Sequence, residues 1–450
     1  MLAGIALSGQ KMKIEEWKQR NLRAKYYAHF DKRLSVDHAW GYISNPDKVA
    51  RHGFFPFIHY VQSFRKYNTK TGVKDKKREL CYASHMDRYI YSYYGYMLNE
   101  KYNERVRKDG ISDSAVAYRT DLGENNIHFA KKTFQFIREN KDCHIIVGDF
   151  THFFDKLDHR YLKRQMCSLL ACESLPADYY AVFKNITRYA TWDLKSLLQI
   201  NRLKDTKKGI KALNRKETVL TGEQFKQNKK ACVVSHKESF GIPQGSPISA
   251  VLSNIYMLEF DNAMRRFTEQ HSGLYMRYSD DFIVVIPDYP EQQFADNLKW
   301  IQEIVLKTEG LELQEEKTQV YQYSNGELSN ISVEYLSGVK DGSDLLNYLG
   351  FTFDGKLVTI RDKTLSKYHY RMYRKADYIV KCGGRTKNGR RISNKELYRL
   401  YSKKGARSGK GNFITYVQNA ERIFTDDPIA RGTSNHMQKI RARLKMMPPF

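Results

Sequence analysis

Residues 275–286 read YMRYSDDFIVVI, and in this stretch two adjacent aspartates, Asp280 and Asp281, interrupt an apolar run. Apolar side chains occupy every second position on both sides of the acids: Leu274, Met276, Tyr278, Phe282, Val284 and Ile286. This alternation predicts two β-strands joined as a hairpin, with the acids at its turn. Two neighbouring carboxylates repel each other and resist removal from water unless a positive charge lies beside them.

A third acid ends another predicted strand. Residues 143–150 read CHIIVGDF, in which apolar residues lead to Gly148 and Asp149. If this strand lies beside the hairpin, three carboxylates converge, and such clusters are tolerated around divalent cations. Oxygen-rich sites of this kind select Mg²⁺ or Mn²⁺. Two ions about 3.5–4 Å apart would activate a hydroxyl and stabilise the leaving group in phosphoryl transfer, so we expect two-metal chemistry.

A glycine-framed loop before the hairpin predicts a phosphate-binding element. Residues 240–260 read FGIPQGSPISAVLSNIYMLEF. We expect Ser246 to cap a helix and Pro247 to occupy its first turn. The apolar residues of that helix form one stripe: Ile248, Val251, Leu252 and Ile255. A loop that enters a helix N-terminus in this way brings backbone amides and the positive end of the helix dipole close to a bound phosphate.

The formal net charge of +26 is unevenly distributed along the chain. Residues 356–450 contain 24 Lys+Arg against 6 Asp+Glu, which is +18 and leaves +8 for the other 355 residues. Such a basic region implies a polyanionic partner, most simply nucleic acid, although a solubilising surface or an anionic-membrane patch has a similar composition. Four tyrosines lie among these charges, which favours backbone neutralisation combined with base stacking. They are Tyr368, Tyr370, Tyr373 and Tyr378.

The sequence argues against membrane-spanning, secreted and zinc-binding classes. No apolar run reaches about 18 residues, so no transmembrane helix is expected. The first residues, MLAGIALSGQKMK, have no basic residue ahead of their short apolar stretch, so we expect no secretory signal. The six cysteines form no CxxC pair, and we expect reduced thiols in a cytoplasmic protein without a zinc site.

Five stretches resemble, in this order, the palm motifs of reverse transcriptases: GDFTHFFDKLDH, GIPQGSPISAVLSNIYM, YSDD, the lysine of LQEEKT, and YLGFTF. Upstream, KKRELCYASHMDRYI and VAYRTDLGENNIHFA resemble the fingers motifs of the same family. The resemblance covers roughly residues 70–355. It implies an α+β right-hand polymerase with fingers, a palm made of an antiparallel sheet plus helices, and a helical thumb.

The resemblance also implies four parts. Residues 1–70 would be an N-terminal extension, 71–147 the fingers, 148–355 the palm, and 356–450 a basic helical thumb or RNA-binding region. Within the palm, the lysine-rich residues 190–238 would be an insertion of hairpin and loop. The implied activity is RNA-directed DNA synthesis from dNTPs, with an RNA template and a DNA primer or product.

Roles for individual catalytic residues follow from the same resemblance. Asp149 and Asp280 would bind both metal ions, with Asp281 completing the site less critically. The backbone carbonyl of Phe150 would be a further metal ligand. Lys317 would protonate the leaving pyrophosphate as a general acid, although without its motif it would be interpreted as a charged helix end.

Other residues would hold the nucleotide and the primer. Arg78 and Arg119 match cations that grip the triphosphate, although a neighbouring lysine could replace Arg78. Phe154 matches the bulky side chain that excludes a ribose 2′-OH, and Gln244 with Gly245 matches the loop that positions the template base and incoming nucleotide. Taken singly, the arginines would be solvated surface charges and the phenylalanine a core aromatic. The hairpin that grips the primer end would comprise Leu349, Gly350 and Phe351.

The stretches GIPQGSPISAVLSN and YSDD resemble those of bacterial, non-retroviral enzymes. The N-terminal NPDKVARHGFFPFI and the C-terminal GNFITYVQNAERIF are most similar to the defence-associated "unknown group" lineages of bacterial reverse transcriptases. That resemblance implies a bacterial cytoplasmic enzyme of antiviral (phage) defence whose template is a structured noncoding RNA, and it sets no oligomeric state. Three alternatives stay open. They are a retron or group II intron-type enzyme, an RNA-dependent RNA polymerase, against which Phe154 argues, and a non-catalytic RNA-binding scaffold with a relic palm.

Overall fold

The computed structural model describes residues 14–445 apart from 69–71, 120, 288–290, 338, 340–341, 387, 407–408 and 410. The chain divides into two compact units. Unit 1 comprises Met1–Arg119, Phe150–Ala263 and Gln302–Glu312, and unit 2 comprises Thr120–Asp149, Met264–Ile301 and Leu313–Phe450. The four-part division expected from the sequence is finer than this one and stays a prediction. Among the described residues, no helix is both long enough and apolar enough to cross a bilayer.

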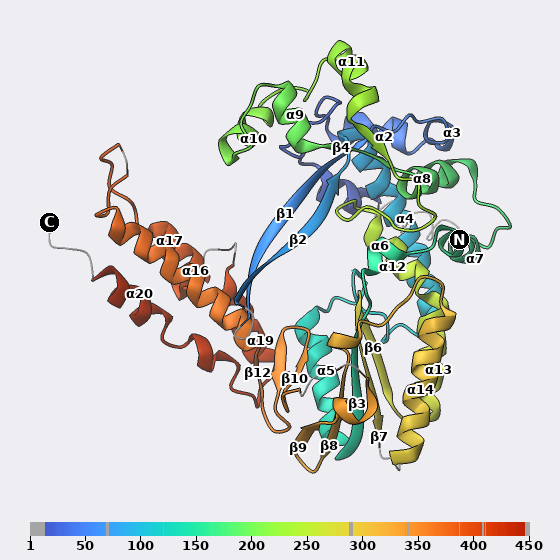
Figure 1. The fold of residues 1–450 in the computed structure, drawn as a ribbon, viewed down its shortest axis with the longest axis vertical. Coiled ribbons are helices and arrows are strands. Elements are labelled where there is room, and N and C mark those ends of the chain that lie inside the picture. Colours follow the sequence, from blue (N-terminus) through green and yellow to red (C-terminus); the bar gives the residue numbers. More distant parts are fainter. Residues whose placement is uncertain are drawn as a thin grey trace, which may run out of the picture. The chain divides into compact units, whose positions relative to one another are not determined.

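Unit 1 combines many helices with a four-stranded sheet in the order β2-β1-β4-β5. Its strands are β1 (Phe57–Asn68), β2 (Gly72–Tyr82), β4 (Ala190–Asp193) and β5 (Val233–Ser235). Its helices include α2 (Val36–Ile43), α3 (Pro46–Ala50), α4 (His85–Lys108), α6 (Phe153–Lys156), α7 (His159–Leu170), α8 (Ala177–Thr187) and α12 (Ser249–Tyr256). β1 and β2 form a long antiparallel ribbon (Figure 1), so the boundary expected at residue 70 falls between two paired strands.

The aromatic segment after β2 forms α4, which lies in the interior of unit 1. The Ser84 hydroxyl caps this helix by accepting a hydrogen bond from the Asp87 N–H at 3.2 Å. Four of its tyrosines are almost fully buried: Tyr89, Tyr91, Tyr94 and Tyr102. α12 approaches α4 closely at Gly95, where a Cβ would lie 3.4 Å from the Ile248 Cα. α4 therefore supports the helix that follows the glycine-framed loop.

The helix predicted after that loop is present but begins later than expected. α12 starts at Ser249, so the prediction that Ser246 caps the helix and that Pro247 occupies its first turn is wrong. The Ser249 hydroxyl donates to the Pro243 carbonyl at 2.7 Å, and this bond keeps the intervening residues in turns. The residues of the predicted apolar stripe are buried, but Ile248 precedes the helix, and the polar Ser253 and Asn254 are buried too, so α12 is enclosed on more than one face.

The prediction that residues 190–238 form a hairpin and loop is right for the paired strands, because β4 and β5 are antiparallel, and wrong for the connection between them. Three short helices lie between β4 and β5: α9 (Leu194–Ile200), α10 (Lys207–Leu213) and α11 (Gly222–Cys232). The hydroxyls of Thr206 and Thr221 cap α10 and α11 by accepting backbone N–H groups. Apolar residues of this segment pack with Phe30 and Ile58 around Trp192. The burial that stabilises these helices comes from residues distant in sequence, so the local composition did not indicate it.

Unit 2 contains a five-stranded antiparallel sheet in the order β6-β7-β3-β8-β9, which Figure 1 shows with β3 at its centre. Its strands are β3 (Asp142–Asp149), β6 (Leu274–Tyr278), β7 (Asp281–Pro287), β8 (Gln319–Ser324) and β9 (Glu327–Asn330). A second sheet contains β10 (Leu346–Tyr348), β11 (Phe351–Phe353) and β12 (Val358–Ile360). The predicted hairpin around the aspartates is confirmed as β6–β7, and so is the mixed α+β fold with antiparallel sheets.

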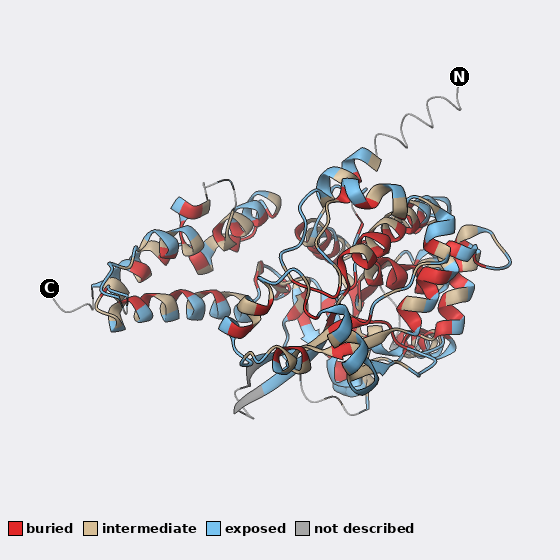
Figure 2. Cartoon of the chain, turned by 90° about the horizontal axis from the view of Figure 1, so that it is seen from above, coloured by how far each residue is buried: buried red, intermediate tan, exposed pale blue. Residues whose placement is uncertain are grey.

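Helices cover both faces of the five-stranded sheet. On one face lies α5 (Asn126–Glu139), where the Thr133 hydroxyl is 3.7 Å from the Met276 sulfur of β6. On the other face, the Phe294 ring of α14 (Glu291–Lys307) stacks on the His144 ring of β3 at 4.2 Å. Buried residues therefore line both sides of the central strands. Figure 2 colours the chain by burial and shows that most helices carry both buried and exposed residues. α13 (Leu258–Gln270) and α14 contribute residues to both units.

The basic C-terminal residues form helices, as predicted. These are α16 (Asp362–Lys381), α17 (Lys395–Tyr401), α18 (Lys403–Ala406), α19 (Phe413–Ile423) and α20 (His436–Leu444). Tyr368 is 5% exposed and belongs to the core of this region. Tyr370 and Tyr378 are 62% and 59% exposed, whereas Tyr373 is partly buried, and stacking of bases on these rings stays a prediction.

Candidate active site

The three predicted acids lie at one end of the five-stranded sheet. Asp149 is the last residue of β3 and stands directly opposite Asp281, the first residue of β7. Asp281 in turn pairs with Tyr278, the last residue of β6. The two-residue turn between these strands consists of Ser279 and Asp280, and Ser279 adopts a left-handed φ of 64°. The hairpin therefore presents Asp280 and Asp281 beside the end of β3.

These carboxylates influence one another electrostatically. Asp281 as a residue is exposed, but protein atoms crowd its carboxyl group. This loss of solvation, followed by the charges of Asp280 and Asp149, raises the pKa of Asp281 to about 6. Lys317 and Arg361 act in the opposite direction and lower the pKa of the same group.

Lys317 provides the positive charge nearest to Asp149. A short 3₁₀ turn, Glu315–Lys317, leads into β8, and the Gln314 N–H donates to the Asp149 carbonyl at 2.8 Å. This backbone bond fixes the turn at the end of β3. The Lys317 ammonium forms an ion pair with Asp149 Oδ2. A protein cation therefore balances part of the negative charge that the sequence assigned to metal ions.

The oxygen atoms at this end of the sheet fit a divalent cation. Asp149 Oδ1 is buried, and no described residue gives it a hydrogen bond. A buried carboxylate oxygen without a donor is a suitable ligand for Mg²⁺ or Mn²⁺. In the described parts of the chain, however, no group of three His, Cys, Asp or Glu side chains is arranged to hold a metal ion. Convergence of all three carboxylates on metal therefore stays a prediction.

A cavity of about 340 Å³ adjoins the acids within unit 2. Its lining includes Asp149, Asp281, Lys317, Asn347 and Arg361. Sequence reasoning missed Arg361, which immediately precedes α16 and is exposed. Its only indication in the sequence is its position between the predicted primer hairpin and the basic helix. The cavity combines carboxylates with cations, which suits metal ions together with phosphate groups.

Arg277 is a second residue that sequence reasoning missed. Its side chain is fully buried, and its Nη1 donates to the Ser279 carbonyl at 2.9 Å. Successive residues of a strand face opposite sides of the sheet, so Arg277 lies on the side opposite to its neighbour Tyr278 and to Asp281. The Arg277 guanidinium therefore stabilises the turn that carries Asp280, from the face of the sheet opposite to Asp281.

The predicted primer-gripping residues form the turn between β10 and β11. Leu349 and Gly350 have φ values of 46° and 92°, as a tight two-residue hairpin turn requires. The Asn126 side chain donates to the Leu349 carbonyl at 2.9 Å, and the Arg361 N–H donates to the Gly350 carbonyl at 3.1 Å. The Phe351 ring is fully buried. The turn is held from both sides, whereas its contact with a primer stays a prediction.

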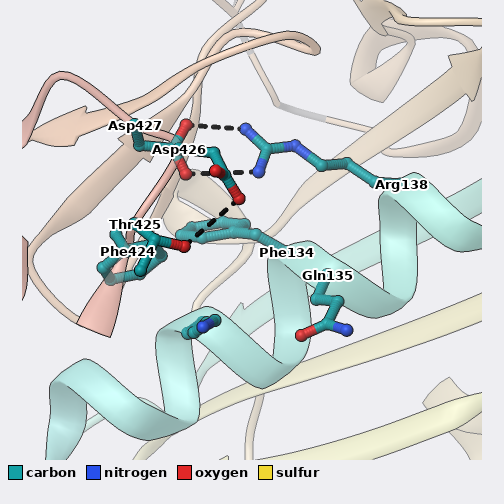
Figure 3. A pocket seen from close by; sticks show the side chains of 8 residues that line it. Phe134, Gln135, Arg138, Phe424, Thr425, Asp426 and Asp427 are labelled. Carbon is teal, nitrogen blue, oxygen red and sulfur yellow. Dashed lines mark hydrogen bonds and ion pairs between the residues drawn. The ribbon is translucent and has the colours of Figure 1, made fainter. Parts of the chain in front are cut away.

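The C-terminal end of α5 anchors the three-stranded sheet of β10, β11 and β12. Figure 3 shows Arg138 of α5 forming a two-pronged ion pair with Asp427, at 2.7 and 3.2 Å. Asp427 also accepts a hydrogen bond from the Val358 N–H of β12 at 2.7 Å, and Arg138 donates to the Lys356 carbonyl at 2.6 Å. A cavity of about 290 Å³ lies beside this pair. α5 therefore joins the primer hairpin to the residues that follow α19.

The loop residues predicted to position the nucleotide lie in unit 1. The Cys81 N–H of β2 donates to the Gln244 carbonyl at 2.8 Å. Gly245 has a φ of 107°, and a Cβ there would lie 2.4 Å from the Cys81 carbonyl oxygen, so only glycine fits. The Gln244 side chain bonds to Asp155, a group whose pKa is raised by burial and lowered in part by His152.

The two phenylalanines after Asp149 have different surroundings. The Phe150 ring is buried against Phe153 and Phe260, which fixes the backbone at this position. Phe154 is only half-buried, and its carbonyl accepts from the Ile242 N–H at 3.0 Å. Its ring is therefore at the surface of unit 1 beside the glycine-framed loop, where a role in sugar selection is sterically feasible.

The two arginines predicted to bind the triphosphate differ in exposure and in their contacts. Arg78 is exposed on β2, with its guanidinium 5.8 Å from the Phe64 ring. Arg119 is 6% exposed, and its guanidinium donates to Asn103 Oδ1 at 3.1 Å and to the Ser112 carbonyl at 2.7 Å. In this structure Arg119 stabilises the loop after α4, and both triphosphate roles stay predictions.

The predicted site residues thus divide between the two units. Unit 1 contains Arg78, Arg119, Phe150, Phe154, Gln244 and Gly245. Unit 2 contains Asp149, Asp280, Asp281, Lys317, Leu349, Gly350 and Phe351. The structure brings Asp149, Asp281, Lys317 and Arg361 together around one cavity, and Asp280 lies in the adjoining turn.

Comparison with known proteins identifies the family. The model of the reverse transcriptase (RNA-dependent DNA polymerase) family matches residues 88–353, which is more than half of the chain. This chain belongs to the reverse transcriptase family. The family resemblance of the sequence motifs is thereby confirmed, whereas the bacterial, defence-associated subgroup stays a prediction. Enzymes of this family generally use divalent metal ions.

No curated protein matches the chain. Among solved structures, it is similar to an apo telomerase from Candida tropicalis truncated from the C-terminal domain, with a TM-score of 0.43 and 13% identity over 73% of this chain and 61% of that chain. A telomerase from Candida albicans in complex with a TWJ fragment of telomeric RNA has a TM-score of 0.40 and 13% identity, over 96% of this chain and 72% of that one. This reverse transcriptase thus covers less than two thirds of the truncated telomerase.

Proposed function

We propose that this chain is an RNA-directed DNA polymerase that makes cDNA from an RNA template by two-metal nucleotidyl transfer. The observation that carries the proposal is the pairing of Asp149 with Asp281 across adjacent strands, with Lys317 beside them. Two acids on adjacent strand ends, a third in the neighbouring turn and a lysine are the groups that such a reaction needs. Membership of the reverse transcriptase family supports RNA as the template.

In the proposed reaction the primer 3′-oxygen attacks the α-phosphorus of a dNTP, and the bond to the β-phosphate breaks to release pyrophosphate. The metal ions would be held by Asp149, Asp280, Asp281 and the Phe150 carbonyl. Bound Mg²⁺ supplies activation of the 3′-hydroxyl and stabilisation of the leaving oxygen. Lys317, once it separates from Asp149, donates a proton to the pyrophosphate. Arg361 offsets the negative charge of the phosphate groups from the wall of the cavity.

Residues of unit 1 would select the nucleotide. Gln244 and Gly245 form a loop whose backbone is already fixed on β2, which limits how a base and its nucleotide can be placed. Arg78 is free to contact a triphosphate because it is exposed. Arg119 would have to exchange its bonds to Asn103 and Ser112 for the phosphate, so Arg78 is the better candidate.

Sugar selection provides the direct test of DNA synthesis. With a primed RNA template and Mg²⁺, we expect the protein to incorporate dNTPs and to reject rNTPs. Phe154→Ala should reduce this discrimination by about tenfold to a hundredfold, because a hydrophobic pocket rejects an added hydroxyl by steric exclusion. The measurement is kcat/KM for dTTP and UTP on the same template.

Phe154→Leu, which keeps most of the bulk, is the matched control and should retain most of the preference. If the Phe154→Ala protein discriminates as strongly as the wild type, this residue does not exclude the 2′-hydroxyl. A wild type that prefers rNTPs is an RNA-dependent RNA polymerase, and one that incorporates neither nucleotide is a scaffold with a relic palm.

We further propose that the enzyme acts in bacterial antiviral (phage) defence with an associated structured noncoding RNA. The support is the wording of the motifs and the basic C-terminal residues, of which 24 are Lys or Arg against 6 Asp or Glu. We expect one RNA species, encoded beside the gene, to dominate the nucleic acid that copurifies with the protein. Sequencing of that nucleic acid is the test. An intron or a retron transcript in its place would assign the chain to one of those classes instead.

A further inference from the structure

The whole net charge of the chain lies in two segments. Residues 356–450 carry +18, and residues 194–235 contain 11 Lys+Arg against 3 Asp+Glu, which is +8. The other 313 residues contain 41 Lys+Arg and 41 Asp+Glu, which is zero. The short segment 194–235 is therefore as distinctive in charge as the C-terminal quarter, although none of the proposed catalytic or nucleotide-binding residues lies in it.

This segment is folded. It comprises α9, α10, α11 and β5, and Figure 1 shows the three helices grouped in one part of unit 1. Leu197, Leu198 and Leu213 are almost fully buried in a core that includes Phe30 and Trp192. Charged, disordered tails have no such core. The cations of residues 194–235, which we call the basic platform, are therefore held on a defined surface.

The cations of the basic platform face solvent and are not balanced by acids. All 11 of its Lys and Arg residues are exposed. Within the described residues, none of them forms an ion pair, and one of the three acids, Glu217, pairs with Lys32 outside the platform. Four lysines lie in and just before α10, opposite its buried Gly209 and Leu213: Lys204, Lys207, Lys208 and Lys211. Unpaired cations in this density repel one another unless an anionic partner covers them.

The composition of the basic platform also indicates the kind of partner. Its single aromatic residue is Phe225, whose ring packs on Phe30 and Trp192. Without an exposed ring the platform cannot stack on unpaired bases, which is how proteins read single strands. α16 differs in this respect, because Tyr370 and Tyr378 are exposed among its cations. The platform therefore suits phosphate groups whose bases are already paired.

We propose that the basic platform binds the phosphate backbone of a folded, double-stranded part of RNA. This inference rests on the proposed function only in taking the polyanion to be RNA. The platform would hold a structured RNA through sequence-independent contacts, so that affinity falls steeply as salt rises. It contributes nothing to the chemical step.

The test compares two full-length variants that lose the same charge. The platform variant replaces Lys204, Lys207, Lys208 and Lys211 by Gln. The control variant replaces four exposed lysines elsewhere by Gln: Lys101, Lys108, Lys184 and Lys299. The probe is an RNA hairpin with a stem of about 16 base pairs, a length that a compact double-stranded-RNA-binding surface spans. Filter binding gives Kd over a series of salt concentrations.

We expect the platform variant to bind the hairpin at least about tenfold more weakly than the control variant near physiological salt. The slope of its plot of log K against log salt concentration should be smaller in magnitude than that of the wild type by about 3 to 4. Each neutralised phosphate contributes about 0.9 to this slope. Replacing the same four lysines by Arg should restore both values. Equal losses in the platform and control variants would overturn the proposal, and so would an unchanged salt dependence.

A separate assay distinguishes this proposal from the proposed function. At saturating concentration of a short primed homopolymer template, the platform variant should incorporate dNTPs at the wild-type rate. A comparable loss of incorporation and of hairpin binding would overturn the platform as a separate surface. If the wild type itself incorporates no dNTP, the proposed function fails, whereas the comparison of hairpin affinities still decides the inference.

Discussion

Asp149→Asn should abolish primer extension while leaving the protein folded. Asp149 is the acid that ends β3, stands opposite Asp281 and carries both the buried Oδ1 and the ion pair with Lys317. Asparagine keeps the shape of the side chain but removes its charge, so it can neither hold a divalent cation strongly nor balance the lysine. We expect kcat to fall on the order of a thousandfold, which is about 4 kcal/mol of transition-state stabilisation. Single-turnover extension with saturating Mg²⁺ measures the effect.

The other two acids provide a graded comparison. Asp280→Asn should be as severe as Asp149→Asn, whereas Asp281→Asn should be milder, because in the proposed site Asp149 and Asp280 hold both ions and Asp281 only completes the set of ligands. Hairpin-RNA affinity is the control and should be unchanged in all three variants. Extension by Asp149→Asn at more than a tenth of the wild-type rate would remove this residue from the catalytic set.

Arg277→Met should cost both stability and activity, although the residue faces away from the acids. The buried guanidinium donates to the Ser279 carbonyl, and Ser279 has a left-handed φ of 64° that serine rarely adopts. Loss of a hydrogen bond from a charged group costs about 1.5–3 kcal/mol. We expect the free energy of unfolding to fall by about that amount and kcat to fall on the order of a hundredfold, because Asp280 is no longer held in one position. Denaturant unfolding and single-turnover kinetics measure the two effects.

Two further variants separate support of the turn from general packing. Arg266→Met removes an exposed arginine of α13 and should change stability by no more than about 0.5 kcal/mol. Ser279→Gly relieves the left-handed strain, so adding it to Arg277→Met should recover part of the lost kcat. An additive double mutant would show that Arg277 does not act through Ser279.

The sequence predicted the central strands of unit 2 well, because the pattern that specifies each strand lies within the strand itself. The alternation around Asp280 and Asp281 specified β6, β7 and their turn, and CHIIVGDF specified β3 with Asp149 at its end. The order of these strands in the sheet was not predicted and is a finding of the structure. The sequence named Lys317 as a site residue without giving its neighbours, and the ion pair with Asp149 is a finding of the structure, whereas its role as a proton donor stays a prediction.

Arg277 was missed for an identifiable physical reason. In an alternating strand, the polar position between Met276 and Tyr278 is expected to face water. In this sheet both faces are covered, by α5 and by α14, so the same position is fully buried. The pattern of one strand cannot show how many layers will pack on it.

Errors elsewhere have a similar origin in tertiary contacts. The helices of residues 190–238 depend on Phe30 and Ile58, which lie more than a hundred residues earlier in the chain. The start of α12 depends on the hydroxyl of Ser249 reaching the Pro243 carbonyl, so the stronger capping sequence at Ser246 was not used. The bonds of Arg119 to Asn103 and Ser112 likewise depend on how a loop folds back on α4, whereas its triphosphate role stays a prediction.

The ion pair between Lys317 and Asp149 has a consequence for how the protein takes up metal. Because Oδ2 of Asp149 already has a positive partner, an incoming cation at that atom replaces a charge instead of adding one. If Asp149 holds a metal ion as proposed, metal uptake would be an exchange, in which hydration of the released lysine offsets part of the cost of removing water from the ion. The displaced ammonium group remains tethered a few bonds from β8, next to the position where the proposed reaction needs a proton donor. Lys317 would thus offset the repulsion among the carboxylates in the metal-free protein. Its release from Asp149 would accompany the binding of the metal ion.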